Sequence, residues 1–136
     1  MEEKQELAVN NFDIECDRST HKIYTSIIDP KVIFNLDNSC DYKLNNCKGE
    51  MIRVVDVLVK VIETKLETGE TEYKKISILL DDKGKSYVTA SKMFTNELLR
   101  YISMFGIESV KKGLDIKIIE KSVKNSSNKA LGFELV

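Results

Sequence analysis

Apolar and polar side chains alternate strongly through the middle of the chain. Four valines of the 51–64 segment occupy alternate positions, and β-branched residues fill many of the others, a pattern typical of a long β-strand. A second segment places Ile76, Ile78 and Leu80 on one face. Turn-forming residues at 67–70 and 81–85 bound this segment. Together the pattern predicts an antiparallel meander with strands at residues 51–64, 72–80 and 86–90.

The period of the apolar positions changes after residue 90. Phe94, Leu98 and Ile102 recur at four-residue spacing, as on one face of an α-helix. Ser91 is suited to cap the start of this helix, and Gly106 to end it. A second, shorter helix is predicted at 30–38, because an Asp-Pro pair directly before an apolar stretch favours a helix start.

Two more strands are predicted beyond this helix, at residues 114–119 and 131–136, with a polar loop at 122–129 between them. The order β-β-β-α-β-β is that of the OB-fold, although other α+β sandwiches share it. The predicted fold is therefore mainly β: a five-stranded antiparallel OB-fold barrel with a helix between strands three and four and a short N-terminal helix.

Residues 1–22 are polar, show no clear period and begin with an acidic stretch. They are predicted to form an extended or weakly ordered arm. The length of 136 residues fits one domain, so residues 23–136 are expected to form a single OB-fold domain.

The charge balance looks neutral but is unevenly distributed. The chain has 21 Lys and Arg against 22 Asp and Glu, which argues against a histone-like basic protein. Between residues 74 and 129, however, the chain has 12 basic side chains and only 6 acidic ones. This excess is compatible with a basic groove on a neutral protein, and equally with an ordinary solvated surface.

Signs of catalysis or metal binding are lacking in the sequence. The 3 cysteines form no C-x-x-C motif, and the one histidine, His21, has no ligand-type residue at metal-binding spacing. Asp81 and Asp82 are adjacent turn residues, and Gly84-Lys85-Ser86 lacks the earlier glycine of a phosphate-binding loop. We therefore expect no enzyme activity, no cofactor and no metal. No apolar run approaches 18 residues, so we expect no membrane span or secretory signal and a cytoplasmic location.

Aromatic and basic residues interleave on the predicted barrel. Tyr73 and Lys75 lie on the strand face away from Ile76, and Tyr87 follows the turn lysines. Rings that stack on bases and amines that neutralise phosphates are what single-stranded nucleic acid requires. Alternatively, the tyrosines are rim or core rings with hydrated hydroxyls. The candidate nucleic-acid-binding residues are Arg53, Lys60, Tyr73, Lys75, Lys85, Tyr87, Lys117, Lys121, Lys124 and Lys129.

Short strings spread from about Ile23 to Val136 also follow the order found in a known family. They are Asp29-Pro30-Lys31, Ile33-Phe34-Asn35, Leu44-Asn45-Asn46-Cys47 with Gly49, Val55-Asp56-Val57, Glu67-Thr68-Gly69-Glu70, residues 78–87, and Gly132-Phe133-Glu134-Leu135-Val136. In these strings the chain resembles the phage-type replication single-stranded DNA-binding proteins of Gram-positive hosts. The resemblance implies an OB-fold, sequence-tolerant binding of single strands, self-association and no catalysis.

The leading hypothesis is thus a non-catalytic protein that coats or protects single-stranded DNA during replication or recombination of a phage or mobile element in a bacterial host. Replication or recombination proteins are expected partners. Many such proteins dock partners through an acidic C-terminal tail. This chain ends in an apolar strand, so its acidic N-terminal arm is the candidate substitute. The alternative is an OB-fold protein-interaction module that docks a host or phage replication partner.

Overall fold

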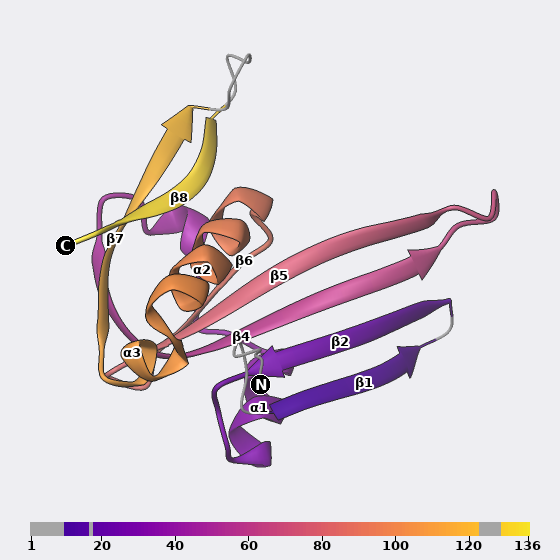
Figure 1. Ribbon diagram of the computed structural model, residues 1–136, viewed down its shortest axis with the longest axis horizontal. Helices are drawn as coiled ribbons and strands as arrows, with labels where there is room; N and C mark the ends of the chain where they lie inside the picture. The colour runs from indigo at the N-terminus through magenta and orange to yellow at the C-terminus, as the bar shows by residue number, and fades with distance from the viewer. Residues whose placement is uncertain (1–9, 17, 123–128) are drawn as a thin grey trace.

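The computed structural model describes residues 10–16, 18–122 and 129–136, which form a curled sheet with three α-helices (Figure 1). The strands are β1 (Asn10–Cys16), β2 (Ser19–Thr25), β3 (Tyr42–Lys43), β4 (Met51–Lys65), β5 (Thr71–Asp81), β6 (Ser86–Thr89), β7 (Leu114–Ser122) and β8 (Lys129–Leu135). The helices are α1 (Pro30–Asn38), α2 (Lys92–Phe105) and α3 (Ile107–Lys111), with a short 3-10 helix at Leu44–Asn46.

The sheet is built around β4, the longest strand. β4 pairs with β5 over most of its length, with β7 through its first residues and with β2 through its last ones. Its register against β5 shifts between Val54 and Asp56, and such bulges bend a strand. Beyond the bend, β1, β2 and the adjoining lengths of β4 and β5 project from the curled part (Figure 1). We call this projection, residues 10–16, 18–25, 58–65 and 71–78, the hairpin arm.

The curled part has the strand order β8-β7-β4-β5-β6, which is consistent with an OB-like fold. The prediction of a mainly β chain with a short N-terminal helix is confirmed. The predicted count of five strands and the all-antiparallel sheet are wrong. The described residues form eight strands in one sheet, and β3 pairs with β6 in parallel. Two helices rather than one separate β6 from β7, because Gly106, at φ 88°, ends α2 and α3 begins directly after it.

The main core lies inside the curled sheet, beneath α2. Phe94, Leu98 and Ile102 of α2 are at most 2% exposed, and they pack with the inward valines of β4 and the apolar residues of β7 and β8. The Phe94 and Phe133 rings lie 5.1 Å apart between centroids. This burial supplies the main driving force that holds α2 against the curled sheet.

The helix signals of the sequence are confirmed. The Ser91 hydroxyl accepts the backbone N–H of Phe94 at 3.1 Å and caps α2. The Asp29 carboxylate accepts the backbone N–H of Lys31 at 2.9 Å and caps α1. In each case a donor left free at the helix start is satisfied. None of the helices in the described segments is long and apolar enough to cross a membrane.

The N-terminal segment differs from the sequence-based expectation. Strands β1 and β2 form a hairpin, and β2 pairs with β4 from Ser19 to Thr25. The described part of residues 1–22 is therefore strand rather than weakly ordered chain, and the expected boundary after residue 22 falls inside β2. Strand β4, with which β2 pairs, lies much later in the sequence, so local patterning gave little sign of this pairing. The division into arm and single OB-fold domain is otherwise untested and stays a prediction.

Candidate nucleic-acid interface

Helix α1 covers one face of β5 and β6. Its buried residues Ile33 and Leu36 pack in a second apolar cluster with Leu58 and Ile78, and Ile76, Leu80 and Val88 line the same cluster. The outer face of the second and third barrel strands often binds nucleic acid in OB-folds. Here that face is apolar and occupied by the protein's own helix, so an interface must lie elsewhere.

Lys60 helps to hold α1 in this position. Its ammonium lies 2.7 Å from the Asp37 carboxylate of α1, and the two side chains are 13% and 25% exposed. A cation that is mostly buried and already paired has little capacity to bind a phosphate. The structure thus places Lys60, a predicted binding residue, in a helix-anchoring contact.

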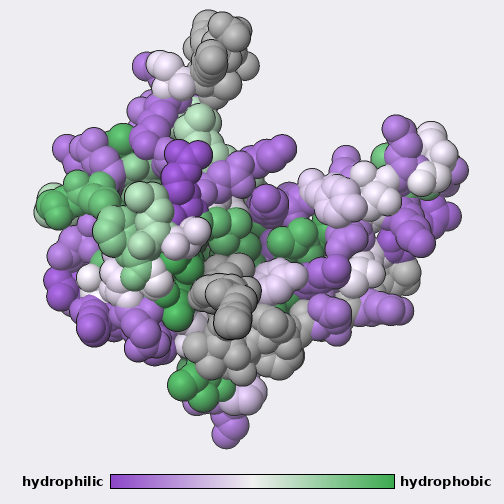
Figure 2. All heavy atoms as spheres, in the orientation of Figure 1, coloured by the Kyte–Doolittle hydropathy of each residue, from purple (hydrophilic) through white to green (hydrophobic). Residues whose placement is uncertain are grey.

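The opposite face of the hairpin arm carries tyrosines and lysines. Residues opposite one another in a sheet point to the same side, and the register gives two rows, Lys22-Val61-Lys75 and Thr20-Glu63-Tyr73. Tyr24 follows next to Lys22 on this side. We call these seven residues the arm face. The side of the arm visible in Figure 2 is predominantly hydrophilic.

Tyr73 and Lys75 are the two predicted binding residues on the arm face. The Tyr73 side chain is 64% exposed, so its ring is open to a stacking partner. Lys75 is half-buried, and its ammonium lies 3.4 Å from the Asn96 side-chain oxygen of α2. Lys22 pairs with Glu63 at 3.0 Å, and this hydrogen bond raises the pKa of Lys22. Tyr73 and Lys75 therefore carry the stacking and cationic capacity of this face.

Glu97, the residue of α2 next to Asn96, holds Lys121 of β7 close to this surface. Glu97 pairs with Lys121 and also accepts the backbone N–H of Phe133 at 3.1 Å. Lys75 and Lys121 thus flank consecutive residues of α2, and Lys129 is exposed at the start of β8. Figure 1 shows α2 between the arm and the β7–β8 hairpin. Lys124 lies outside the described residues.

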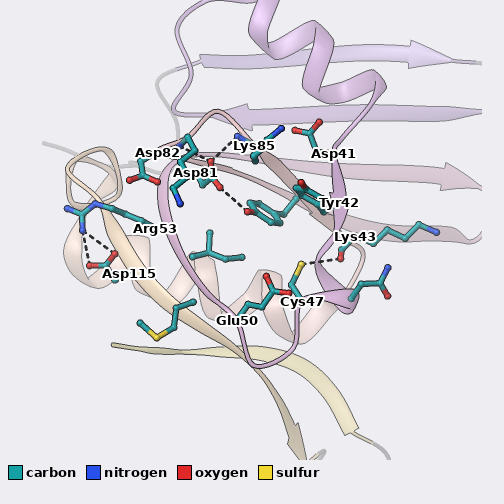
Figure 3. A pocket seen from close by; sticks show the side chains of 15 residues that line it. Asp41, Tyr42, Lys43, Cys47, Glu50, Arg53, Asp81, Asp82, Lys85 and Asp115 are labelled. Atoms are coloured by element: carbon teal, nitrogen blue, oxygen red, sulfur yellow. Dashed lines mark hydrogen bonds and ion pairs between the residues drawn. The ribbon is translucent and has the colours of Figure 1, made fainter.

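A separate cleft of about 980 Å³ contains three other predicted residues, Arg53, Lys85 and Tyr87 (Figure 3). It lies between the 41–53 segment, the 81–85 turn and the start of β7. We call it the Tyr42 cleft. Lys117 is outside its lining, although it lies opposite Met51 at the edge of the cleft. The predicted residues therefore fall on separate surfaces rather than in one groove.

Asp81 organises the wall of this cleft. One carboxylate oxygen accepts the backbone N–H groups of Lys83 and Lys85 at 2.9 and 2.8 Å, and the other accepts the Tyr87 hydroxyl at 2.8 Å. Burial alone would raise the pKa of Asp81, but these hydrogen bonds outweigh it and lower that pKa. Burial, together with the bond to Asp81, raises the pKa of Tyr87. The pair is therefore a carboxylate and a neutral phenol at neutral pH.

Three residues of these surfaces were missed by sequence reasoning. Lys22 was assigned to the polar N-terminal arm and Tyr24 to the start of the folded domain without a binding role, although Lys22-Ile23-Tyr24-Thr25 alternates as a strand does. Tyr42 lies in a strand of only two residues, which gives no periodic signal. The tilted contact between the Tyr42 and Tyr87 rings, with centroids 5.4 Å apart, depends on the parallel pairing of β3 with β6.

Metal-binding geometry is absent from the described segments, where no three His, Cys, Asp or Glu side chains gather to hold an ion.

Neither a curated protein nor a solved structure matches the chain. A family model described as phage single-stranded DNA-binding protein matches residues 4–135, nearly the whole length. This match confirms the resemblance seen in the sequence. The chain belongs to the phage single-stranded DNA-binding protein family.

Proposed function

We propose that this protein binds single-stranded DNA with little dependence on sequence, without catalysis, and so coats or protects DNA strands during phage replication or recombination. The observation that carries the proposal is the exposed Tyr73 ring beside Lys75 on the arm face. Family membership supports the class of ligand. The place of action would be the cytoplasm of the bacterial host, with replication or recombination proteins as partners and with self-association along the strand.

The chemistry of the arm face suits a single strand better than a duplex. A flat exposed ring stacks on any base that is not already stacked in a duplex, at about 1–3 kcal/mol per base. Lys75 supplies a cation for the adjoining phosphate. Asp13 and Glu15 are exposed on β1, in the same cross-strand rows as Lys22 and Thr20. Their negative charge would repel phosphates from the β1 side, so the strand would follow the β5 side.

From Tyr73 and Lys75 the strand would pass the start of α2 and reach the exposed Lys129, running beside Lys121, whose ammonium is paired with Glu97. We infer that this path crosses the barrel from β5 to the start of β8. The five barrel strands would be β4, β5, β6, β7 and β8, with the barrel open between β6 and β8. The difference from many OB-folds is that α1 occupies the outer face of β5 and β6.

The test is a titration of labelled oligo-dT of several lengths against the wild-type chain and matched variants. Tyr73→Leu should weaken binding by about 1–3 kcal/mol because the stacking ring is lost, whereas Tyr73→Phe keeps the ring and should bind almost as well as wild type. Equal affinities of the two variants would show that Tyr73 does not stack.

Salt dependence tests the role of the lysines. Each phosphate neutralised on a single strand contributes about 0.7 to the slope of log affinity against log salt concentration. Lys75→Ala should lower the magnitude of that slope by about this amount. Lys112→Ala, an exposed lysine after α3, should leave the slope unchanged. Absence of any single-strand binding at low salt would overturn the proposed function itself.

A protein-interaction module is the second candidate, because β1 and β8 each have one edge without a partner strand among the described residues. An extended segment of another protein can add to such an edge through backbone hydrogen bonds. A mobility shift with single-stranded but not double-stranded DNA supports DNA binding. If neither form of DNA shifts and the protein binds a replication protein, the protein-interaction module is supported instead.

A further inference from the structure

We propose that the Tyr42 cleft binds one nucleotide of the DNA strand, with the base stacked on Tyr42, and that it prefers bases carrying an exocyclic amino group. The proposal rests on the proposed function, since it adds a second contact site to the same ligand. The cleft is distinct from the arm face, because none of its lining residues belongs to that face.

The Tyr42 ring is held in place yet accessible. Its β3 strand pairs with β6, which sets Tyr42 directly opposite Tyr87, and the two rings are tilted by 30°. Tyr87 is fixed in turn by its hydroxyl bond to Asp81 and by packing against the main core. Tyr42 nevertheless remains 47% exposed. A ring that is supported on one side and open on the other loses little freedom when a base stacks on it.

Exposed lysines line the same cleft as the ring. Lys43, Lys83 and Lys85 line the cleft and are exposed, and their ammonium groups make no ion pair with any described residue. Arg53, by contrast, is paired with Asp115 at 3.0 Å. These three ammonium groups, outside any ion pair within the described segments, provide charge for the phosphates that flank a stacked base.

Carboxylates give the cleft its base preference. Five acidic side chains line it beside four basic ones, so a ligand with several clustered phosphates would be repelled. Asp81, Asp41 and Asp115 already accept hydrogen bonds from the protein. Asp82 and Glu50 are exposed and accept none from the described residues. An ionised carboxylate can only accept hydrogen bonds, so it pairs well with the exocyclic amino group of cytosine or adenine. Thymine has a carbonyl oxygen in place of that amino group and cannot donate to the carboxylate.

The absence of tryptophan from the chain provides a direct test. Tyr42→Trp introduces a single tryptophan, whose emission should be quenched when a short oligo-dC is added, because the base stacks on the indole. Tyr42→Leu should reduce oligo-dC affinity by about 5- to 150-fold, and Tyr42→Phe should restore it. Phe34→Leu, which removes another exposed ring, on α1, serves as the matched control and should bind as wild type does.

Base preference is tested by comparing oligo-dC with oligo-dT. Wild type should favour oligo-dC, and a double Glu50→Gln and Asp82→Asn variant should lose part of that preference. DNA binding with unquenched Tyr42→Trp emission and unchanged Tyr42→Leu affinity would overturn the nucleotide site while leaving the proposed function intact. A lack of preference in wild type would overturn the amino-base selectivity. Failure of wild type to bind any single strand would remove both proposals.

Discussion

Replacing Asp81 with alanine should destabilise the fold by about 3 kcal/mol. Asp81 is 7% exposed and accepts three hydrogen bonds. A hydrogen bond to a charged group contributes about 1.5–3 kcal/mol, and we assign about 2 kcal/mol to the one from the half-buried Tyr87 hydroxyl. The backbone N–H groups of Lys83 and Lys85 lie in an exposed turn, where water can accept the hydrogen bonds that Asp81 no longer accepts. We therefore assign about 0.5 kcal/mol to each of these two bonds.

The assay is urea unfolding followed by circular dichroism, with Asp82→Ala as the matched control. A slope of about 1.5 kcal/mol per molar urea converts the loss into a midpoint about 2 M lower for Asp81→Ala. Asp82 is the adjacent residue, is exposed and accepts no hydrogen bond from the described residues. Its replacement should change the free energy of unfolding by less than about 0.5 kcal/mol.

The pH dependence of the same two variants provides a second readout. The pKa of Asp81 is lowered in the folded state, so the ionised carboxylate stabilises the fold. This stabilisation is fully present above the unfolded-state pKa of about 4 and is lost as pH falls through the lower folded-state pKa. Wild type and Asp82→Ala should therefore lose stability more steeply below about pH 4 than Asp81→Ala does. Equal midpoints for the two alanine variants, or parallel acid profiles, would refute the reasoning.

Two further predictions concern contacts that position the candidate surfaces. Lys60→Met should cost about 2–3 kcal/mol of unfolding free energy because it leaves the Asp37 carboxylate mostly buried and unpaired. A double Lys60→Met and Asp37→Leu variant should recover most of this loss in the same urea titration, and no recovery would argue against the pair. Gly113→Ala should cost about 1–3 kcal/mol, since φ is +118° and the new methyl group would lie 2.7 Å from the Arg53 guanidinium that binds Asp115. Adding Arg53→Ala should relieve only the steric part, so full recovery would contradict the backbone argument.

The sequence predicted those parts of the fold that local signals encode. The β4-β5-β6 meander follows from alternation and turn residues, and helix α2 follows from the Ser91 cap, its apolar period and Gly106. Strands β2 and β3 depend on partners distant in the chain. Their short or weakly apolar sequences carry little information about those partners, which is why the pairing of β2 with β4 and the parallel pair were not predicted.

The candidate site was predicted only by residue type. Tyr73, Lys75, Lys85 and Tyr87 lie on accessible or cleft-lining surface, as their chemistry suggested, but no pattern showed that they occupy two surfaces. Lys60 lies in an ion pair with Asp37 of α1, which the sequence did not indicate, because alternation along a strand separates its two faces without showing what covers each. Leu79 and Ile78 point to opposite sides of β5 and are both buried, since α1 supplies cover that the barrel pattern alone does not reveal.

The position of α1 also limits how the protein can be shortened. A variant beginning at β4 would keep every predicted barrel strand, yet it would uncover Leu58, Ile76, Ile78, Leu80 and Val88. An apolar strip of this kind on a sheet that also has open edges favours aggregation. The residues of β2, α1 and the segment between them that pack on this strip, Ile23, Ile27, Ile33 and Leu36, are thus needed to keep it out of water. A tag or fluorescent fusion that replaces β2 and α1 would therefore expose an apolar surface, whereas one that leaves them in place would not.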